Sequence, residues 1–369
     1  MTSVTEIAAE LVRIPSINPD SEDPGFHCTG EMDCAQRVFE FLEDAGADAS
    51  LREVAPGRPN VVARFPSKTP NAPRVLFAPH LDTVSVSGMT IPPFDGTIRD
   101  GCLWGRGASD TKGPMASMLW SLLDCRDFLT DLPVEIWFAG LVGEEAGQIG
   151  AKALADQERF DFVIAGEPTS LQVVHAHKGS CWLHLKTRGH AVHASRPETG
   201  DNAIYKMATA IDTLRNRVAP RLSEKTDSLL GGSTLSVGTI RGGSKVNIVP
   251  DFCEAHVDIR TIPGIDPSFI TAMLQESVPD ISVTLHRSEP LYTDPSNPFI
   301  KKLQALGAGL AGAPWFCDAA VFASKGCPAV AIGPGSINQA HTADEFIAIN
   351  DLEEGAAFFS RFLQSLRLA

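Results

Sequence analysis

Residues 75–84 read Val-Leu-Phe-Ala-Pro-His-Leu-Asp-Thr-Val, and the other motifs of the chain can be placed around this stretch. It begins as an apolar run, which predicts a buried strand, and His80 and Asp82 follow two positions apart at its carboxyl end. A metal-bound imidazole usually shares its second ring nitrogen with a carboxylate, so this pair is a candidate metal ligand with an orienting aspartate. Taken alone, two polar residues that cap a strand-to-loop turn would explain the same sequence.

Three further apolar runs also end in acidic or glycine-rich residues. They are residues 134–142 before Glu144 and Glu145, residues 162–165 before Glu167, and residues 329–332 before a Gly-Pro-Gly turn and His341. Runs without alternation, separated by helical stretches, predict an α/β fold with a mostly parallel central sheet and helices on both faces. In such sheets the ligand site lies beyond the carboxyl ends of the strands, where these polar residues gather.

The middle of the chain has a different pattern, because its apolar residues alternate with polar ones. The expected elements are strands at 181–188, 234–240, 252–260 and 281–285, and helices at 202–218 and 267–278. This order is that of an α+β ferredoxin-like domain with one solvated sheet face. The sequence therefore predicts a catalytic domain, residues 1–174 and 285–369, with an inserted domain at 175–284. Further helices are expected at 4–14, 32–46 and 115–129, and a short strand at 61–63.

Composition excludes several classes of protein. With 369 residues the chain exceeds one typical core, and its net charge of −14 argues against a nucleic-acid or anionic-membrane surface. No apolar run approaches the about 18 residues that a membrane span requires, and the first residues lack a signal-peptide pattern, so a cytoplasmic location is expected. The eight scattered cysteines, which include Cys28, are expected to be reduced.

Two adjacent carboxylates after a buried strand, Glu144 and Glu145, are costly to hold together unless a cation is present or they share a proton. A metal removes the conflict, and the hard oxygen and imidazole donors of the chain provide a candidate ligand set: His80, Asp110, Glu145, Glu167 and His341. Five groups fit two ions if Asp110 bridges them, and Glu144 is then left as a general base. A competing dinucleotide-binding interpretation of Gly105 and Gly107 is weak, because the third glycine is missing and no strand is expected immediately before them.

Four segments resemble the dizinc family of acetylornithine deacetylase, succinyl-diaminopimelate desuccinylase, aminoacylase and carboxypeptidase G. They read Pro-His-Leu-Asp-Thr-Val at 79–84, Gly-Arg-Gly-Ala-Ser-Asp-Thr-Lys-Gly at 105–113, Gly-Glu-Glu at 143–145 and Gly-Glu-Pro-Thr at 166–169. The resemblance covers nearly the whole chain in the same order. It departs from the family only in small ways, such as Ala78 where glycine is frequent and Thr111 where methionine is frequent.

The resemblance implies two Zn²⁺ ions, with Co²⁺ or Mn²⁺ as alternatives. One ion would be held by His80, Asp110 and Glu167, and the other by Asp110, Glu145 and His341. Asp82 would orient His80, and Glu144 would take a proton from the attacking water and deliver it to the leaving amine. The resemblance also implies a cis peptide bond after Asp110.

The inserted domain resembles the lid and dimerisation domain of the same family, which implies a homodimer. His193 would reach the partner subunit's active site and stabilise the oxyanion. Asn247, Arg260 and the backbone of Gly335 would bind the carboxylate of the substrate. The remaining histidines are interpreted as surface or hydrogen-bonded core residues, and His256 as part of a solvated charge cluster.

The implied activity is the hydrolysis of a linear amide in a small N-acyl amino acid, with N-acetylornithine as the first candidate and arginine synthesis as the setting. The alternatives are a succinyl-diaminopimelate desuccinylase, a dipeptidase or carboxypeptidase of the same family, and a metal-containing amino-acid-binding protein without turnover. Asp344 and Glu345, just after His341, are interpreted as a helix-cap or loop pair.

Overall fold

A computed structural model describes residues 2–20 and 30–367, and the chain divides into two compact units. Unit 1 comprises Met1–His175, Thr293–Ala311 and Cys317–Ala369, and unit 2 comprises Ala176–Tyr292 and Gly312–Phe316. The boundary expected between residues 284 and 285 falls inside strand β14 (Ser282–Ser288). The seven cysteines among the described residues are free thiols, whereas Cys28 lies outside the described residues.

Unit 1 is built on a large sheet whose neighbouring strands follow the order β1, β2, β6, β3, β7, β17 and β8. Their bounds are Asp48–Ala55, Arg58–Phe65, Glu135–Gly140, Arg74–Ala78, Phe162–Ala165, Ala329–Ala331 and Val173–His177. Strands β6, β3, β7 and β17 run parallel to one another, and β1 and β2 add antiparallel strands at one side. The four apolar runs therefore form adjacent parallel strands, as predicted.

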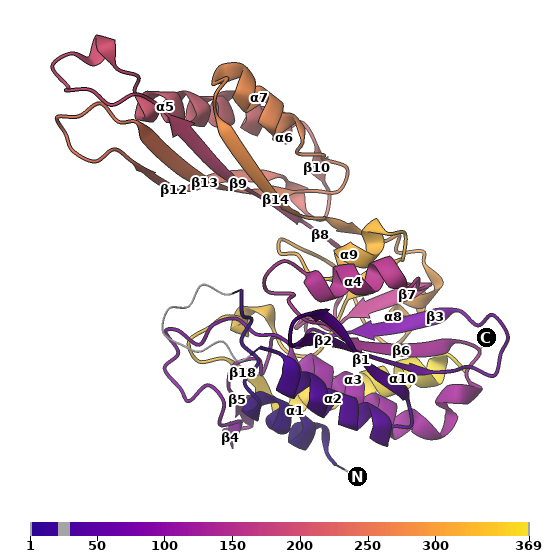
Figure 1. The fold of residues 1–369 in the computed structure, drawn as a ribbon. Coiled ribbons are helices and arrows are strands. Elements are labelled where there is room, and N and C mark those ends of the chain that lie inside the picture. The colour runs from indigo at the N-terminus through magenta and orange to yellow at the C-terminus, as the bar shows by residue number, and fades with distance from the viewer. Residues whose placement is uncertain (1, 21–29, 368–369) are drawn as a thin grey trace. The chain divides into compact units, whose positions relative to one another are not determined.

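The parallel strands are apolar throughout because helices cover both faces of the sheet (Figure 1). Helices α1 (Val4–Arg13), α2 (Met32–Asp44), α3 (Lys112–Cys125) and α10 (Ile349–Ser365) lie on one face, and α4 (Ile149–Gln157) and α9 (Ala319–Ser324) lie on the other. Phe77 on β3 packs against Phe359 and Phe362 of α10, with ring centroids 5.5 and 6.3 Å apart. The predicted α/β architecture is confirmed.

Two strands of unit 1 differ from the sequence-based expectation. Strand β1 was not expected, because its residues show neither a continuous apolar run nor a strict alternation. Strand β5 (Cys102–Trp104) lies immediately before Gly105, so the expectation that no strand precedes this glycine was wrong. Three residues carry no periodic signal, and β5 exists because it pairs with β4 (Thr97–Arg99) and with the distant β18 (Phe346–Ala348).

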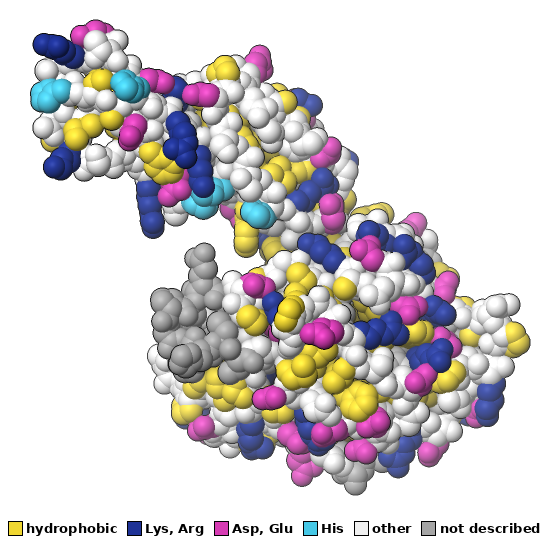
Figure 2. Space-filling view, in the orientation of Figure 1, with side chains coloured by type: hydrophobic (Ala, Val, Ile, Leu, Met, Phe, Trp, Pro, Cys, Tyr) yellow, Lys and Arg dark blue, Asp and Glu magenta, His cyan; other side chains and the backbone are white. Residues whose placement is uncertain are grey.

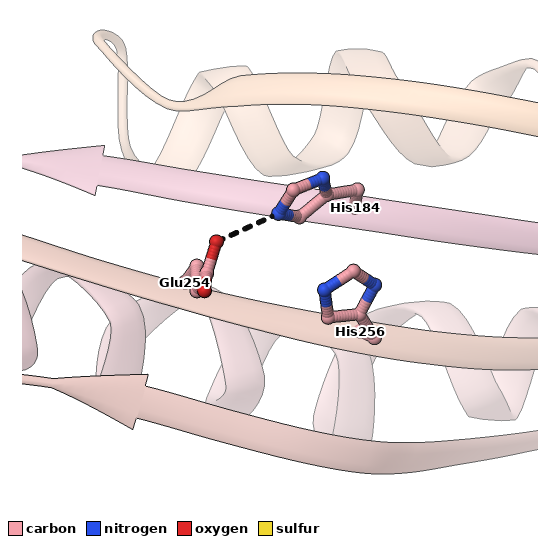
Figure 3. A group of neighbouring side chains, drawn as sticks. All are labelled: His184, Glu254 and His256. Carbon is pink, nitrogen blue, oxygen red and sulfur yellow. Dashed lines mark hydrogen bonds and ion pairs between the residues drawn. The ribbon is translucent and has the colours of Figure 1, made fainter. Parts of the chain in front are cut away.

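Unit 2 contains a four-stranded antiparallel sheet in the order β12 (Thr234–Gly242), β13 (Phe252–Thr261), β9 (Gly179–Arg188) and β14. Helices α5 (Ala203–Thr213) and α7 (Phe269–Ser277) pack on one face through a separate apolar core. The other face carries polar side chains, among which His184 and His256 lie directly opposite each other on β9 and β13 (Figure 3). This arrangement is the split β-α-β pattern that the alternating residues predicted.

The remaining elements connect or flank these two frameworks. They are α6 (Ala219–Leu222), α8 (Pro298–Ala305), β10 (Thr226–Asp227), β11 (Gly231–Gly232), β15 (Leu291–Tyr292), β16 (Leu310–Ala313), η1 (Arg126–Asp131), η2 (Pro197–Thr199), η3 (Leu214–Val218) and η4 (Ile337–Gln339). Acidic and basic side chains are interspersed over the face of each unit that Figure 2 shows. Among the helices that the structure describes, none combines the length and the apolar character that crossing a bilayer demands.

Candidate metal centre

His80 follows β3 directly, and the end of that strand fixes the orientation of its ring. The ring is 3% exposed, its Nδ1 lies 2.9 Å from the backbone carbonyl of Asp82, and its Nε2 lies 3.1 Å from Oδ1 of Asp110. A carbonyl can only accept, so Nδ1 carries a proton and Nε2 faces a carboxylate oxygen. Burial alone would lower the pKa of His80, but hydrogen bonds to Asp110 and Asp82 raise it well above its usual value. Nε2 and the carboxylate oxygen cannot both accept, so a proton or a metal ion must lie between them.

Asp110 lies between two histidines, at the end of the loop that precedes α3. Its Oδ1 contacts His80, and its Oδ2 lies 3.4 Å from Nε2 of His341. Burial would raise the pKa of Asp110, but the hydrogen bonds with His341 and His80 outweigh it and hold the pKa below the usual range. Its two oxygens therefore face opposite partners, the arrangement that a bridging carboxylate needs. The Asp110-Thr111 peptide bond is cis, as the family resemblance implied.

All five residues of the candidate ligand set come together. Nε2 of His341 lies 3.2 Å from Oε1 of Glu145, and one group of possible ligands consists of Asp110, Glu145 and His341. A second group consists of His80, Asp110 and Glu167. Within each group the potential ligand atoms lie within 4.8 Å of one another, and Asp110 belongs to both. The sequence-based assignment divided the same five residues in the same way.

Glu144 lies beside these groups without belonging to either of them. It is 9% exposed and can form a further cluster with His80 and Glu145. Burial raises the pKa of Glu144 well above its usual value, and the negative charge of Glu167 adds to that rise. Burial likewise raises the pKa of Glu145 and of Glu167, in each case reinforced by the charge of Asp110. The protein thus holds a set of buried carboxylates whose charges bound cations would balance.

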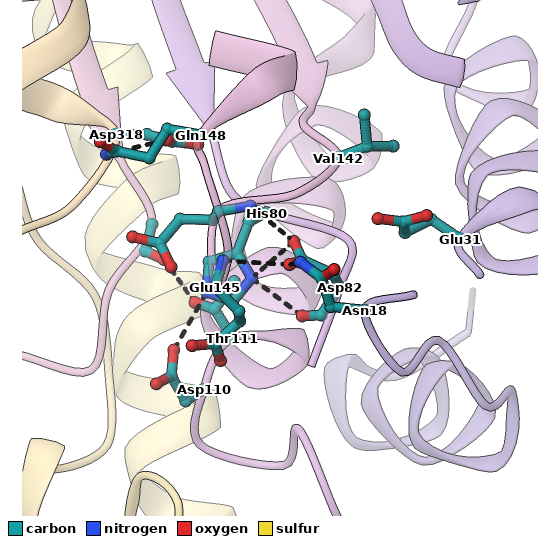
Figure 4. A network of polar contacts seen from close by, with 12 residues as sticks. Asn18, Glu31, His80, Asp82, Asp110, Thr111, Val142, Glu145, Gln148 and Asp318 are labelled. Carbon is teal, nitrogen blue, oxygen red and sulfur yellow. Dashed lines mark hydrogen bonds and ion pairs between the residues drawn. The ribbon is translucent and has the colours of Figure 1, made fainter. Parts of the chain in front are cut away.

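Asp82 contacts His80, as expected, and has further partners that were not expected (Figure 4). Its carboxylate accepts hydrogen bonds of 3.0 Å from the backbone N–H groups of Glu144 and Glu145, and one of 2.7 Å from the Asn18 side chain. Its Oδ1 lies 3.5 Å from Nδ1 of His80, whereas the backbone carbonyl oxygen of Asp82 lies closer to that nitrogen, at 2.9 Å. Asp82 therefore orients the two glutamates through their backbone, while its carbonyl holds the histidine.

Asn18 connects this carboxylate to a buried ion pair that no sequence motif indicates. Arg58 is paired with Glu31 at 2.6 Å, and its Nη2 lies 3.4 Å from the Asn18 side-chain oxygen. Arg58 and Glu31 are both buried, and Arg58 also contacts Asp20 at 2.6 Å. The segments that carry these residues match no motif. The contacts could not be expected from the sequence, because the partners lie far apart in the chain. The network fixes the Asn18 amide, which in turn fixes Asp82.

Glu345 lies in the loop just before β18, as expected, but its carboxylate has partners that no local motif indicates. It is fully buried, and its two carboxylate oxygens accept from the backbone N–H groups of Gly107, Ser109 and Asp110 at 2.9–3.0 Å. Its Oε2 also lies 2.7 Å from Nη1 of Arg106. These contacts were not expected, because the partners lie at least 235 residues away in the sequence. Glu345 holds the loop that presents Asp110.

Asp318 is a further buried acid near these carboxylates that sequence analysis did not select. Its Oδ1 accepts from the Gln148 side chain at 3.3 Å, and its Oδ2 has no hydrogen-bond partner among the described residues. Burial raises the pKa of Asp318 to about 7, although the charge of His80 opposes this rise. The Asp318 carboxyl is buried without a full set of hydrogen bonds, and only the three-dimensional structure can show this.

The residues expected to contact substrate belong to both units. Gly335 lies in unit 1, where its carbonyl accepts from the backbone N–H of Ser170 at 2.7 Å. His193, Asn247 and Arg260 lie in unit 2. The backbone N–H of Ala194 donates to the Asn247 carbonyl at 3.0 Å, so the segments that carry His193 and Asn247 are adjacent.

Arg260 and His193 each have a local partner in unit 2. Nε of Arg260 donates to Asp258 at 2.9 Å, and the guanidinium lies 5.7 Å from the ring centre of Phe316. Nδ1 of His193 accepts from the backbone N–H of Ser195 at 3.2 Å and lies 2.8 Å from its hydroxyl. Because Nδ1 is an acceptor, the neutral ring carries its proton on Nε2.

The donor set fits a pair of divalent cations. Two imidazoles and three carboxylates converge around Asp110, no thiolate is among them, and the ring nitrogens face carboxylate oxygens. Oxygen and imidazole donors of this kind suit Zn²⁺, Mn²⁺ and Co²⁺. A metal-free protein must instead keep protons on several of these groups, which agrees with the raised pKa values of Glu144 and Glu167.

Comparison with known proteins gives the class of this chain. Residues 76–365 match peptidase family M20/M25/M40, and the chain belongs to this family. It is therefore a metal-dependent hydrolase of peptide or related amide bonds.

Solved structures share the fold over nearly the full chain. A tripeptidase from Staphylococcus aureus is 23% identical, with a TM-score of 0.79 over 99% of this chain and 98% of that chain. An M20 family metallo-carboxypeptidase from Sulfolobus solfataricus is 20% identical, with a TM-score of 0.80 over the whole of both chains. A dinuclear metal-binding peptidase of the M20 family from Bacillus subtilis is 13% identical, with a TM-score of 0.69 over 99% and 98%.

Proposed function

We propose that the protein removes the acyl group from a small N-acyl amino acid, with N-acetylornithine as the first candidate substrate and arginine synthesis as its setting. The observation that carries the proposal is the pair of ligand groups that share Asp110, with Glu144 beside them and outside both. The motifs around Glu167 and His341, Gly-Glu-Pro-Thr-Ser-Leu-Gln and Gly-Pro-Gly-Ser-Ile-Asn-Gln-Ala-His, favour this member of the family by resemblance.

In this proposal His80, Asp110 and Glu167 hold one Zn²⁺, and Asp110, Glu145 and His341 hold the other. Bound there, the two ions would lower the pKa of a shared water and polarise the amide carbonyl. Glu144 accepts the proton of the attacking water, because it is a buried carboxylate that lies beside both ligand groups and belongs to neither. Glu144 then delivers that proton to the leaving amine.

His193 serves as the oxyanion donor in this proposal. The hydrogen bond from Ser195 to Nδ1 leaves an N–H on Nε2, and a neutral donor of that kind stabilises the negative charge that develops on the carbonyl oxygen. The family resemblance assigns this histidine to the active site of the partner subunit, so the enzyme acts as a homodimer through unit 2. Strand β12 supports this, because it is an edge strand, and Ile240 on it is 51% exposed.

Arg260, Asn247 and the backbone of Gly335 bind the carboxylate of the substrate. A guanidinium presents two parallel N–H donors to a carboxylate, which suits Arg260 to this role. In the structure Asp258 occupies Nε of Arg260, so substrate binding exchanges that partner or adds a second one. A cytoplasmic location is also part of the proposal, supported by the free thiols of the seven described cysteines.

A peptidase is the second candidate function. The names of the neighbours favour it, since the Staphylococcus aureus protein is a tripeptidase and the Sulfolobus solfataricus protein is a metallo-carboxypeptidase. Deacylation and peptide hydrolysis use the same metal centre. They differ in the group that lies on the acyl side of the amide bond to be cleaved. N-succinyl-diaminopimelate is a third substrate to test, because its acyl group is larger than acetyl and carries a carboxylate of its own.

The deciding experiment measures release of free amine by metal-stripped protein with and without added Zn²⁺, Co²⁺ or Mn²⁺. The panel contains N-acetylornithine, N-succinyl-diaminopimelate, other acyl-amino acids, and unblocked di- and tripeptides. Zinc-dependent preference for acetylornithine supports the proposal, and preference for unblocked peptides replaces it with the peptidase. Absence of all turnover with both ions bound would leave a binding protein.

The role of Glu144 is tested separately from the substrate. Glu144→Ala should retain both metal ions and lose most of kcat, whereas loss of an ion would make Glu144 a ligand. Mixed dimers of His193→Ala and Glu144→Ala subunits should recover part of the activity, because one of the two sites then has both groups intact. No recovery in verified mixed dimers contradicts the action of His193 across the subunit boundary.

A further inference from the structure

Unit 2 carries a second cluster of potential metal ligands, on the open face of its sheet. His184 on β9 lies directly opposite His256 on β13, and Glu254 lies two residues before His256 on the same face. Nε2 of His184 is 3.0 Å from Oε2 of Glu254, and the two imidazole rings stack with centroids 4.1 Å apart at 19° (Figure 3). One potential ligand atom from each residue lies within 4.8 Å of the others.

The backbone holds these three side chains in place. Strands β9 and β13 are the two inner strands of the four-stranded sheet, so each is hydrogen-bonded on both sides. Side chains opposite each other on such strands keep a fixed spacing, and residues two apart share a face. His184 and Glu254 are half-buried and His256 is exposed, so the cluster opens to solvent while its base stays rigid.

Within this cluster, a hydrogen bond joins only two of the three side chains. The Glu254 carboxylate is bonded to His184, while the His256 ring stacks on that of His184. Lys186 and Arg241 lie opposite Glu254 on the neighbouring strands, and Asp258 follows on the same face of β13. A cluster of solvated charges explains the position of the Glu254 carboxylate. It does not explain why the two imidazole rings stack and bring their nitrogen atoms close together.

We propose that His184, Glu254 and His256 form a binding site for one divalent transition-metal ion, of which Zn²⁺ is the reference case and Cu²⁺ or Ni²⁺ the competitors. Two imidazoles and one carboxylate are an established donor set for such ions, and water fills the open position. The potential ligand atoms lie within 4.8 Å of one another, and rotation of the exposed His256 ring can bring its nitrogen to the closer spacing that bonds of about 2.0–2.1 Å to a tetrahedral ion require. Hard ions such as Mg²⁺ and Ca²⁺ are excluded, because they prefer oxygen ligands.

The test uses full-length protein whose ions at the unit 1 centre are in place. Zn²⁺ is titrated calorimetrically, and the ions bound per chain are counted by mass spectrometry of the metal after removal of free Zn²⁺. Wild type should bind one ion more than His184→Ala or His256→Ala. His286→Ala is the matched control, because His286 is an exposed histidine on the same sheet face, opposite Trp182 and outside the cluster.

A second readout reports the position of the ion directly. Substoichiometric Cu²⁺ should broaden the imidazole NMR signals of His184 and His256 and leave that of His286 sharp. Equal metal content in wild type, His184→Ala and His256→Ala would overturn the proposal, as would equal broadening of all three histidines. Circular dichroism and unchanged basal hydrolysis of the variants show that they are folded, so a lost ion reports the site itself.

Discussion

Single residues that touch no substrate determine where the candidate ligands of unit 1 lie. Glu345 holds the Asp110 loop through three backbone N–H groups, and Asp82 holds Glu144 and Glu145 through two. A carboxylate that accepts several backbone N–H bonds forms stronger interactions than a neutral acceptor. Metal affinity and catalytic geometry therefore depend on charges that lie behind the ligands.

Glu345→Gln tests this dependence with nearly unchanged side-chain volume. The amide presents one acceptor oxygen where the carboxylate presents two, and its NH₂ group faces backbone donors, so the loop that carries Asp110 should loosen. We expect a loss of metal affinity of about 10- to 100-fold, as for other residues that orient metal ligands. Competition with a metal-binding indicator dye measures this affinity.

Asp344→Asn is the control, because Asp344 is the exposed neighbour of Glu345 and loses the same charge. It should leave metal affinity unchanged. Equal losses in both variants would mean that net charge, and not the contacts of Glu345, governs affinity.

Asp318 predicts a pH dependence of stability for the metal-free protein. Burial raises the pKa of Asp318 to about 7, so its contribution to stability is complete at low pH and is lost as the pH rises through that value. Asp318→Asn removes the ionisation and should make the metal-free protein more stable than wild type at pH values above about 7. Melting temperatures across the pH range measure the difference, which should shrink on acidification. A constant difference at every pH would contradict the assignment.

At this scale, motifs predicted the candidate ligands and Asp82, but not the more distant residues that hold their loops in place. His80, Asp110 and Glu145 stand in segments with a clear local pattern. Glu345 and Asn18 do not, because their roles are defined by partners 235 and 64 residues away. A sequence shows which side chain a position carries, and only folding shows what that side chain meets.

Among the elements, the loops at the carboxyl ends of the parallel strands carry the chemistry. Apolar runs predicted β3, β6, β7 and β17, because strands buried on both faces must be apolar throughout. Strand β5 escaped prediction because tertiary pairing, and not its own residues, makes it a strand. The alternation of apolar and polar residues predicted the strands of unit 2, because one face of their sheet is exposed to solvent.

Gly143→Ala tests the turn that follows β6 and leads into Glu144. Gly143 has φ +76°, and an added Cβ would lie 2.7 Å from Cγ1 of Ile149. We expect a stability loss of about 1–3 kcal/mol and weaker metal binding, because the backbone that carries Glu144 and Glu145 must shift. Urea denaturation and metal content measure the two effects.

Gly57→Ala separates backbone strain from crowding. Gly57 has a similar φ of +72°, but nothing lies within 4 Å of the position of its added Cβ. This variant should share the cost of the left-handed conformation and keep its metal ions. Loss of metal from Gly57→Ala would show that general destabilisation explains the result.

For the whole molecule, the two units differ in their dependence on the ions of unit 1. All five candidate ligands lie in unit 1, where Glu144, Glu145 and Glu167 have pKa values raised by burial. Removal of the ions leaves these carboxylates without balancing charge, whereas the helices of unit 2 pack on a separate apolar core.

Hydrogen exchange should therefore respond to chelation in one unit only. We expect faster exchange after metal removal at residues 80–84, 105–113 and 143–149, and unchanged exchange in α5 and α7 of unit 2. Mass spectrometry of peptides from the same sample measures both, so the helices serve as an internal control. Equal acceleration in both units would show that metal binding stabilises the chain as a whole.

The order in which the candidate ligands appear along the chain also has a consequence for biosynthesis. His80, Asp110, Glu145 and Glu167 all precede unit 2, whereas His341 and its neighbour Glu345 follow it. A ribosome that has translated only the first 175 residues has made four ligands, but neither the fifth nor the carboxylate that holds the Asp110 loop. The candidate metal centre can be completed only after unit 2 has been synthesised, and a nascent chain presents at most an incomplete site.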